Sequence, residues 1–542
     1  MKSIVSLLSI IALGLGLVGC PGSGGGSGED GPPAFAVSTT AADFGVVGNA
    51  GYSSTLSATS GTPPYTWTDV GNVLLGLGLT LDIVTGVISG NPTASTATAF
   101  AVTFQVTDSV GGTASGPVTL RLRPRTDRAS VDAAGDSITG SSNTEPSINR
   151  TNGRFIAFSS TAPNLVAGVT GNQVYVHDRQ TGQPSVVSKD SFGSAGIGGV
   201  SNAASISADG RFVAFVSTAA NLVPGVSGQQ IYLHDTQTSV AFPNGQTTLV
   251  SKDGSGIPAG AGSNTSPRIS ADGRFIAFVS TAANLVPGVS GQQIYLHDTQ
   301  PAPNGQITLV SKDGTGAAAS SGSTNISPTI SADGRFVAFV STATNLVPGV
   351  TGQQIYLHDT QPVPNGQTTL VSKDGSGNPA SSGSTNASPT ISADGRFVAF
   401  VSTATNLVPG VTGQQIYLHD TQPTPNGLTT LVSKDGSGNP ASSGSTNTSP
   451  TISANGRFVA FASNATNLVA TVTGQQVYRH DTQTGPNGQN VVVSLNSADL
   501  PGTGGNSIAP SITDNGDFVA FSSSAPLIPP AAATDVYVRA VP

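Results

Sequence analysis

Histidine is the side chain that titrates nearest neutral pH, so it is the first candidate for acid–base chemistry. The chain has six, each followed directly by an aspartate: His177, His234, His297, His358, His419 and His480. A carboxylate beside an imidazole could orient the ring, as in a catalytic triad. An active site is normally one constellation, however, and here one pair recurs without a unique serine or cysteine. We therefore interpret the histidines as structural and assign no catalytic residue.

Oxygen-rich loops offer a second chemistry, calcium binding. In residues 374–378 and 435–439, oxygen-bearing side chains occupy alternate positions, such as Asp374, Ser376 and Asn378. Each loop has one carboxylate, whereas calcium loops usually have three or more. Asp82 and Asp108 are isolated acids further upstream. Turn formation accounts for all of these residues, so we expect no metal site and no cofactor.

The histidines belong to a repeat of about 60 residues. Its marker is Asp-Gly or Asn-Gly followed by Arg-Phe, or by Asp-Phe in the last copy. The marker occurs seven times, with its glycine at positions 153, 210, 273, 334, 395, 456 and 516. Seven markers predict seven structural units.

One unit predicts four short strands, A to D, at residues 389–393, 396–403, 414–420 and 429–434. The Asp394-Gly395 pair between strands A and B predicts a two-residue type I′ turn, with positive φ at both residues. Strand B does not alternate apolar with polar residues, so we expect both of its faces to be covered. Longer loops, residues 404–413 and 435–448, follow strands B and D.

Seven such units predict a β-propeller, in which each four-stranded sheet is a blade. The last unit stops after strand C, at residues 535–539, and a segment resembling the missing strand D precedes the first unit at residues 128–133. Pairing of these two segments would close the ring and remove free sheet edges. We therefore predict an all-β chain with a seven-bladed propeller at residues 125–542, closed by an N-terminal strand.

The segments Ser-x-Asp-Gly-Arg-Phe-Val-Ala-Phe and Ile-Tyr-Leu-His-Asp resemble the TolB-like (WD40-like, PD40) propeller repeats of bacterial envelope proteins, over residues 128–541. The resemblance implies the fold and use outside the cytoplasm. It does not imply one activity. Related repeats often carry acids before strand C, and residues 349–354 lack them, so the resemblance does not extend to calcium binding at this loop.

Residues 34–124 predict a separate small domain with strands at residues 35–37, 52–58, 65–68, 101–107 and 118–122. The sequence around Trp67, at residues 79–92 and at residues 104–108 resembles the Ig-like, cadherin-like modules of bacterial surface proteins. The resemblance implies a β-sandwich that acts as a spacer or adhesion module. We expect Trp67, the only tryptophan, to be a core residue.

Residues 1–20 have the pattern of a secretory signal: Lys2, then an apolar run. The end, Leu-Val-Gly-Cys, resembles the lipobox of bacterial lipoproteins, which implies cleavage before Cys20 and lipidation of that residue. An ordinary signal peptide is the alternative. Residues 21–33 would form a Gly/Ser/Pro tether. Pro21 is not the aspartate that favours inner-membrane retention, so we expect an envelope protein lipid-anchored to the outer membrane, on its periplasmic or surface face.

Charge excludes one class of partner. Only 9% of residues are charged and the formal net charge is −8. Apart from Lys2, all five lysines occupy one position of the repeat, at Lys189, Lys252, Lys312, Lys373 and Lys434. A mildly acidic chain without a basic cluster is a poor binder of nucleic acid.

The loops after strands B and D lie at one end of an antiparallel blade, and we take this long-loop face as the candidate binding surface. The candidate ligand-face residues are Asn284, Gln292, Asn345, Gln353, Asn406 and Gln414. Near-identical loops in successive units suit a repetitive ligand through multivalency. Recent duplication without a ligand explains them equally well. The leading hypothesis is a non-enzymatic envelope protein that binds a protein or polysaccharide partner.

Two other functions stay open. One is a polysaccharide hydrolase or lyase with its site at the propeller channel, for which Glu145, Asp517 and Asp535 are the non-repeated carboxylates. The other is a purely structural surface scaffold.

Overall fold

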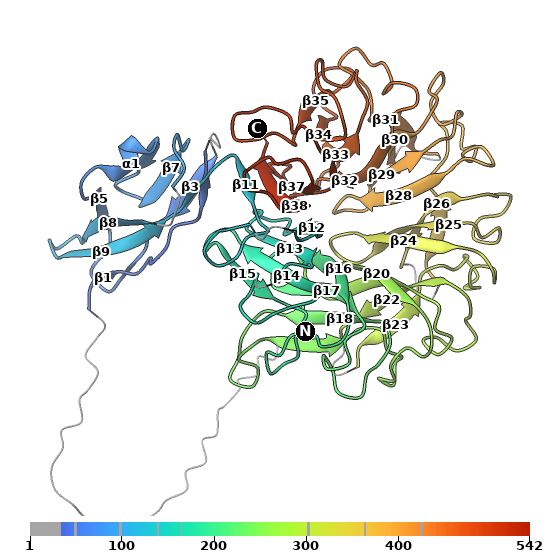
Figure 1. Ribbon diagram of the computed structural model, residues 1–542, viewed down its shortest axis with the longest axis horizontal. Coiled ribbons are helices and arrows are strands. Elements are labelled where there is room, and N and C mark those ends of the chain that lie inside the picture. Colours follow the sequence, from blue (N-terminus) through green and yellow to red (C-terminus); the bar gives the residue numbers. More distant parts are fainter. Residues whose placement is uncertain are drawn as a thin grey trace, which may run out of the picture.

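The computed structural model describes residues 34–47, 51–96, 100–137, 140–163, 165–300, 304–361, 365–422 and 426–541. These residues form a small β-sandwich followed by seven four-stranded sheets arranged as a ring (Figure 1). The predicted all-β fold, with an Ig-like domain and a propeller, is thereby confirmed. The predicted signal peptide, Cys20 and the tether lie outside the described residues.

The Ig-like sandwich, residues 34–123, is built from two three-stranded sheets, β5-β8-β9 and β3-β7-β6, and two strand pairs, β1-β4 and β10-β2. Its elements are β1 (Ala36–Val37), β2 (Gly45–Val46), β3 (Tyr52–Thr55), β4 (Ala58–Thr59), β5 (Thr66–Asp69), α1 (Val73–Gly76), β6 (Leu79–Leu81), β7 (Val87–Gly90), β8 (Phe100–Thr107), β9 (Thr113–Leu120) and β10 (Leu122–Arg123). Trp67 is 3% exposed and packs in the core with Phe104 and Leu79, which confirms its predicted place.

Each propeller blade has strand order A-B-C-D, and we number the blades 1 to 7 along the chain. The A strands are β12 (Asn143–Ile148), β16 (Ser201–Ile206), β20 (Asn264–Ile269), β24 (Asn325–Ile330), β28 (Asn386–Ile391), β32 (Asn447–Ile452) and β36 (Ser507–Ile512). The B strands are β13 (Phe155–Ser160), β17 (Phe212–Ser217), β21 (Phe275–Ser280), β25 (Phe336–Ser341), β29 (Phe397–Ser402), β33 (Phe458–Ser463) and β37 (Phe518–Ser523). The A strands lie toward the centre of the ring, around the channel.

The outer half of each blade is formed by strands C and D. The C strands are β14 (Gln173–Asp178), β18 (Gln230–Asp235), β22 (Gln293–Asp298), β26 (Gln354–Asp359), β30 (Gln415–Asp420), β34 (Gln476–Asp481) and β38 (Asp535–Ala540). The D strands of blades 1 to 6 are β15 (Gln183–Val186), β19 (Gln246–Leu249), β23 (Gln306–Leu309), β27 (Gln367–Leu370), β31 (Leu428–Leu431) and β35 (Gln489–Val492).

Blade 7 takes its D strand from the other end of the propeller sequence. β11 (Thr126–Arg128) pairs antiparallel with β38, with Arg128 opposite Tyr537. Beyond the strand, Ser130 Oγ accepts a hydrogen bond from Val536 N at 3.0 Å, as Ser433 Oγ does from Ile416 N at 2.9 Å in blade 5. The predicted closure is therefore confirmed. The paired segment begins at Thr126, two residues before the predicted match.

Strand B is buried on both faces because neighbouring blades pack against it. In blade 5, Phe400 stacks on Tyr417 with ring centroids 5.9 Å apart. The same cluster includes Ala338 and Ile355 of blade 4. Six further Phe–Tyr pairs repeat this contact around the ring. The uninterrupted apolar run of strand B therefore reflects packing between blades, as predicted.

The predicted type I′ turn between strands A and B is wrong. Gly395 has φ 77°, but Asp394 is not in the left-handed region, and the connection runs from Ile391 to Phe397. Asp394 Oδ1 accepts hydrogen bonds from Arg396 N at 3.0 Å and from Ser392 Oγ at 2.6 Å. The carboxylate thus caps a wider turn, in which only the glycine needs positive φ.

A β-bulge interrupts every A strand where it begins to line the channel. In blade 5 the register shifts between Ala387 and Thr390, and Ser388 has φ 50°. The equivalent residues with positive φ are Glu145, Ala203, Ser266, Ser327, Ser449 and Ala509. Such bulges re-aim backbone groups away from the ladder. We call these seven positions the bulge ring.

Candidate functional site

The six histidines are buried in the blades, as the structural interpretation predicts. His234, His358 and His419 place Nδ1 at 2.8–2.9 Å from the hydroxyl of a threonine on their own D strand. The Thr368 hydroxyl in turn donates to the carbonyl of Lys312 in the preceding blade, at 2.6 Å. Burial lowers the pKa of five of the histidines to about 4 and that of His177 to about 3. At neutral pH the six rings are uncharged, and those of His234, His358 and His419 link strands C and D of their own blades.

The aspartate after each histidine does not orient the imidazole. Neighbouring residues on a strand point to opposite faces, and Asp420 receives two hydrogen bonds from Arg396, from Nε at 2.8 Å and from Nη2 at 2.7 Å. The Arg396 guanidinium also lies 4.7 Å from the centre of the Phe397 ring. Blades 1 to 6 each have this bidentate clasp. The repeated His-Asp motif therefore serves two separate structural contacts.

The oxygen-rich loops are closed turns. Asp374 Oδ1 accepts hydrogen bonds from Ser376 N and Asn378 N, both at 2.9 Å. In the sandwich, Asp82 accepts from Val84 N at 2.9 Å and Asp108 from Gly112 N at 2.6 Å. Within the described ranges, no group of three or more His, Cys, Asp or Glu side chains could hold a metal ion.

Buried amides support the long-loop face from beneath. In blade 5, Gln415 accepts a hydrogen bond from Ser433 Oγ at 2.6 Å. Its Nε2 donates to the carbonyls of Thr412 and Ala441, both at 3.0 Å. These two carbonyls belong to the B–C loop and to the loop that follows strand D. Blades 1 to 4 and 6 have the same glutamine network. Each pair of loops is thus fastened to the blade below it.

The six predicted ligand-face residues hold the loops together. Asn406 Oδ1 accepts from Ser381 N at 2.9 Å and Ser381 Oγ at 2.7 Å, and its Nδ2 donates to the Pro379 carbonyl at 2.9 Å. Asn345 and Asn284 pin the equivalent loops of blades 4 and 3.

The side chains of Gln353 and Gln414 each donate to a backbone carbonyl of the blade that follows their own. The backbone carbonyl of Gln292 accepts a hydrogen bond from Asn325 of the following blade. The side-chain amides of the other five residues therefore bond the protein itself, and direct ligand contact by all six stays a prediction.

The central channel encloses a cavity of about 420 Å³ lined by the A strands. Its wall is mostly serine, threonine, proline and aliphatic residues, and its charged residues are Glu145, Arg150 and Arg268. Arg150 is paired with Asp514 at 2.7 Å and also donates to the Ile452 carbonyl. Glu145 Oε2 accepts a hydrogen bond from the backbone N–H of Ala203 at 2.9 Å.

A circle of backbone hydrogen bonds joins the blades at the A–B-turn end of the channel. Ala208, Ala271, Ala332, Ala393 and Ala454 each donate through N–H to the equivalent carbonyl of the next blade, at 3.0 Å. Asp514 N–H donates to Arg150 O at 2.8 Å, and Thr151 N–H donates to Ala208 O at 3.2 Å. The circle is complete, while the bulge ring lies nearer the long-loop face.

The three non-repeated carboxylates do not form one acid–base site. Glu145 lies in the channel. Asp535 is buried at the closure, where it binds Ser130 at 2.8 Å and Arg128 at 3.2 Å. Asp517 immediately precedes β37, at the end of that strand where Phe518 pairs with Ala540. Asp535 pairs with Ser523, at the opposite end of β37. The three side chains cannot meet on one substrate atom in this arrangement.

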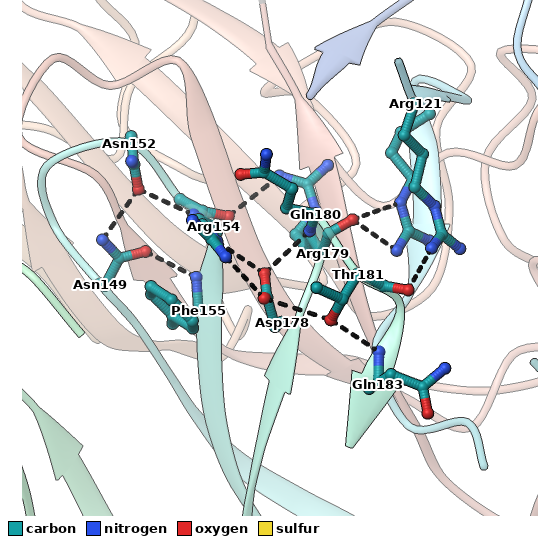
Figure 2. Close-up of polar contacts among 12 residues, drawn as sticks. Arg121, Asn149, Asn152, Arg154, Phe155, Asp178, Arg179, Gln180, Thr181 and Gln183 are labelled. Carbon is teal, nitrogen blue, oxygen red and sulfur yellow. Dashed lines mark hydrogen bonds and ion pairs between the residues drawn. The ribbon is translucent and has the colours of Figure 1, made fainter. Parts of the chain in front are cut away.

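The Ig-like sandwich is docked on the propeller at its closure. Arg121 donates to the Thr181 carbonyl at 2.5 Å, and Gln180 donates to the Ala42 carbonyl at 2.9 Å. Figure 2 shows Arg121 beside Thr181 at the end of blade 1, next to the clasp of Arg154 and Asp178. The two domains thus share hydrogen bonds.

A buried ionic cluster lies under this junction. Arg179 is fully buried, and its Nε lies 3.4 Å from Asp127, which also pairs with Arg123 at 3.1 Å. Arg123 donates to the Arg179 carbonyl at 2.6 and 2.8 Å. Two cations thus face one buried carboxylate, Asp127, and offset the cost of burying its charge.

Arg179 and Arg268 were not among the predicted site residues, although the repeat contains a signal for both. The position of Arg179 is threonine in blades 2 to 6, at Thr236, Thr299, Thr360, Thr421 and Thr482. The position of Arg268 is serine or threonine in the other six blades. This departure from the repeat consensus could have singled out both residues in the sequence.

The fold defines this chain as an Ig-like sandwich joined to a seven-bladed β-propeller. The model of the family described as "Putative Ig domain" matches residues 33–123. No curated protein matches the sequence. Among the described residues, no helix has the length and apolar character needed to cross a membrane.

Solved structures with a similar fold include the β-propeller domain of the Trilobed protease from Pyrococcus furiosus. It is 12% identical, with 72% of this chain and 91% of that chain covered and a TM-score of 0.41. The putative TolB of Agrobacterium tumefaciens is 16% identical, with coverages of 66% and 94% and a TM-score of 0.33. A prolyl endopeptidase is 15% identical, with coverages of 71% and 46% and a TM-score of 0.42. These are similarities of fold.

Proposed function

We propose that this chain is a non-enzymatic, lipid-anchored protein of the bacterial cell envelope. In this proposal, the long-loop face of its propeller binds a repetitive polymer, a polysaccharide, by contacting several blades at once. Cys20 would carry the lipid anchor to the outer membrane, and the Ig-like sandwich would hold the propeller beyond the tether. A protein partner is the competing outcome.

The observation that supports this proposal is the equal geometry of neighbouring loop pairs. The contact from Ser320 N to Asn345 Oδ1 is 2.9 Å, that from Ser381 N to Asn406 Oδ1 is 2.9 Å, and the equivalent contact to Asn467 is 2.8 Å. Blades 4, 5 and 6 therefore present similar rigid surfaces at regular intervals. Loops that are already ordered lose little entropy on binding, and equal sites on one scaffold add avidity for a repetitive ligand.

Exposed threonines of the B–C loops are suitable probes, because their side chains leave the supporting network intact. We would change Thr344, Thr405 and Thr466 to glutamate, one at a time and together. The binding of residues 34–542 to an array of envelope polysaccharides is the measurement. One change should weaken binding only a few-fold, whereas three should weaken it by about 100-fold or more, since avidity multiplies.

The matched control places the same charges on the opposite face, by changing exposed Gln300, Gln361 and Gln422 to glutamate. Its binding should equal that of the unchanged chain. Saturable binding by residues 34–124 alone would move recognition to the sandwich. If the propeller bound no polysaccharide and one envelope protein were cross-linked to this face, the partner would be a protein and not a polymer.

A further inference from the structure

The channel contains one cation whose charge the protein does not neutralise by contact. Arg268 Nη1 donates to the Pro267 carbonyl at 2.9 Å. Among the described residues, no carboxylate lies within ion-pair distance of Arg268, whereas Arg150 is matched by Asp514. The Arg268 side chain is accessible to channel water but is surrounded by A strands. A guanidinium held in this way attracts an anion.

The channel already holds one carboxylate, its own. Glu145 Oε2 accepts from the backbone N–H of Ala203, which occupies the bulge ring in blade 2. The same positive φ recurs at Ser266, Ser327 and Ser388, so we infer that their N–H groups point toward the channel in the same way. Concavities lined by backbone N–H groups are common anion sites.

Hydroxyl groups complete the donor set on the side of blades 3 to 6. The bulge ring there consists of serines, Ser266, Ser327, Ser388 and Ser449, all of which line the cavity. Their hydroxyls form no hydrogen bond with another described residue, so they are available as donors. The lining contains no aromatic side chain, which leaves polar contacts and charge as the means of recognition.

We propose that the propeller channel is a binding site for a carboxylate group, formed by Arg268 with the backbone N–H groups and hydroxyls of the bulge ring in blades 3 to 5. Glu145, on the blade 1 side, repels a second carboxylate and so sets an upper limit on affinity. The bulge ring lies toward the long-loop end of the channel. The carboxylate site does not depend on the proposed function, because a free acid and an acidic polymer both carry a carboxylate.

The charges around Arg268 agree with this assignment. The surrounding protein lowers the pKa of Arg268 by desolvation, and the nearby negative charge of Glu145 works in the opposite direction. A carboxylate held against Arg268 would act in the same sense as Glu145 and favour the charged guanidinium.

The test uses two sugars that differ only in a carboxylate, glucuronate and glucose, titrated calorimetrically into the full chain, with inorganic phosphate as a third probe. The key variant is Arg268→Thr, because blades 4 to 6 carry threonine at this position in the same fold: Thr329, Thr390 and Thr451. We expect glucuronate to bind, glucose not to bind, and Arg268→Thr to weaken glucuronate by about 10- to 100-fold.

Two further variants make the outcome specific. Glu145→Ser introduces the residue of blades 3 to 6 and should strengthen glucuronate binding, because it removes the repelling charge. Arg335→Gln removes an arginine from an outer clasp and should leave binding unchanged. The assignment is overturned if glucuronate gives no binding, if glucose or phosphate binds as tightly, or if Arg268→Thr keeps full affinity. Loss of polymer binding on the long-loop face would leave these results unaffected.

Discussion

The guanidinium carbon of Arg179 lies 4.6 Å from the centre of the Phe44 ring, and the ring of Phe518 lies 4.9 Å from the same carbon. Phe44 belongs to the Ig-like sandwich and Phe518 to blade 7, while Arg179 follows strand C of blade 1. One buried cation therefore joins the sandwich, the first blade and the last blade. The sandwich and the closure of the propeller share this contact, which makes the junction a structural part of the ring.

Replacing Arg179 by alanine should destabilise the chain by about 3 kcal/mol, because it empties a fully buried site and removes one of the two cations that face Asp127. Two aromatic rings would also lose a cation between them. The free energy of unfolding in urea measures the effect. Arg335→Ala is the control, since its partner Asp359 sits in a clasp whose arginine is 43% exposed, and solvent screens exposed pairs so that they contribute little. Equal losses in the two variants would refute the role of the junction.

Acid should destabilise the propeller in a window set by its histidines. An unfolded histidine is protonated below about pH 6.5, whereas burial holds five of the folded ones neutral down to about pH 4. The unfolded chain therefore binds more protons between these values, and stability falls as pH falls from 6.5 toward 4. The full shift corresponds to about 3 kcal/mol for each histidine.

Urea unfolding at a series of pH values tests this prediction. The free energy of unfolding should be constant above about pH 7 and decline below pH 6.5. His358→Asn should make the decline in the free energy of unfolding shallower by the contribution of one histidine, because it removes one titrating group. A free energy that stays level down to pH 5 would show that the buried rings do not govern acid stability.

The closure should be more sensitive to a lost hydroxyl than an internal blade is. Ser130 Oγ accepts from Val536 N and donates to Asp535 at 2.8 Å. In blade 5, Ser433 accepts from Ile416 N but donates to a neutral amide, Gln415. Ser130→Ala should therefore cost about 1–3 kcal/mol and exceed the loss from Ser433→Ala, since hydrogen bonds to charged groups are stronger.

Unfolding rates after rapid transfer into denaturant compare the two serine variants. We expect the Ser130 variant to unfold faster, because opening the pair of β11 and β38 exposes both edges of the ring. Identical rates would mean that the closure is not the point at which the propeller opens.

The sequence by itself determined the repeat, the four strands of each unit, the burial of strand B and the closing strand. These follow from local pattern: a strand buried on both faces must be apolar at successive positions, and a truncated last unit needs its missing strand from elsewhere. It did not predict the turn at Asp394, because the hydrogen bonds of that carboxylate are made only once Ser392 and Arg396 are in place.

Only the tertiary structure decided which polar residues meet. The histidine and aspartate of each repeat are adjacent in sequence yet point to opposite faces, so spacing alone suggested a pair that does not form. Glu145 and Arg268 are 123 positions apart in sequence but line one channel because the blades close into a ring. Arg179 meets Phe44 and Phe518 only where the two ends of the propeller and the sandwich converge. Contacts set by ring closure depend on all seven blades at once, so the repeat pattern can show that Arg179 and Arg268 are exceptional but not which residues they meet.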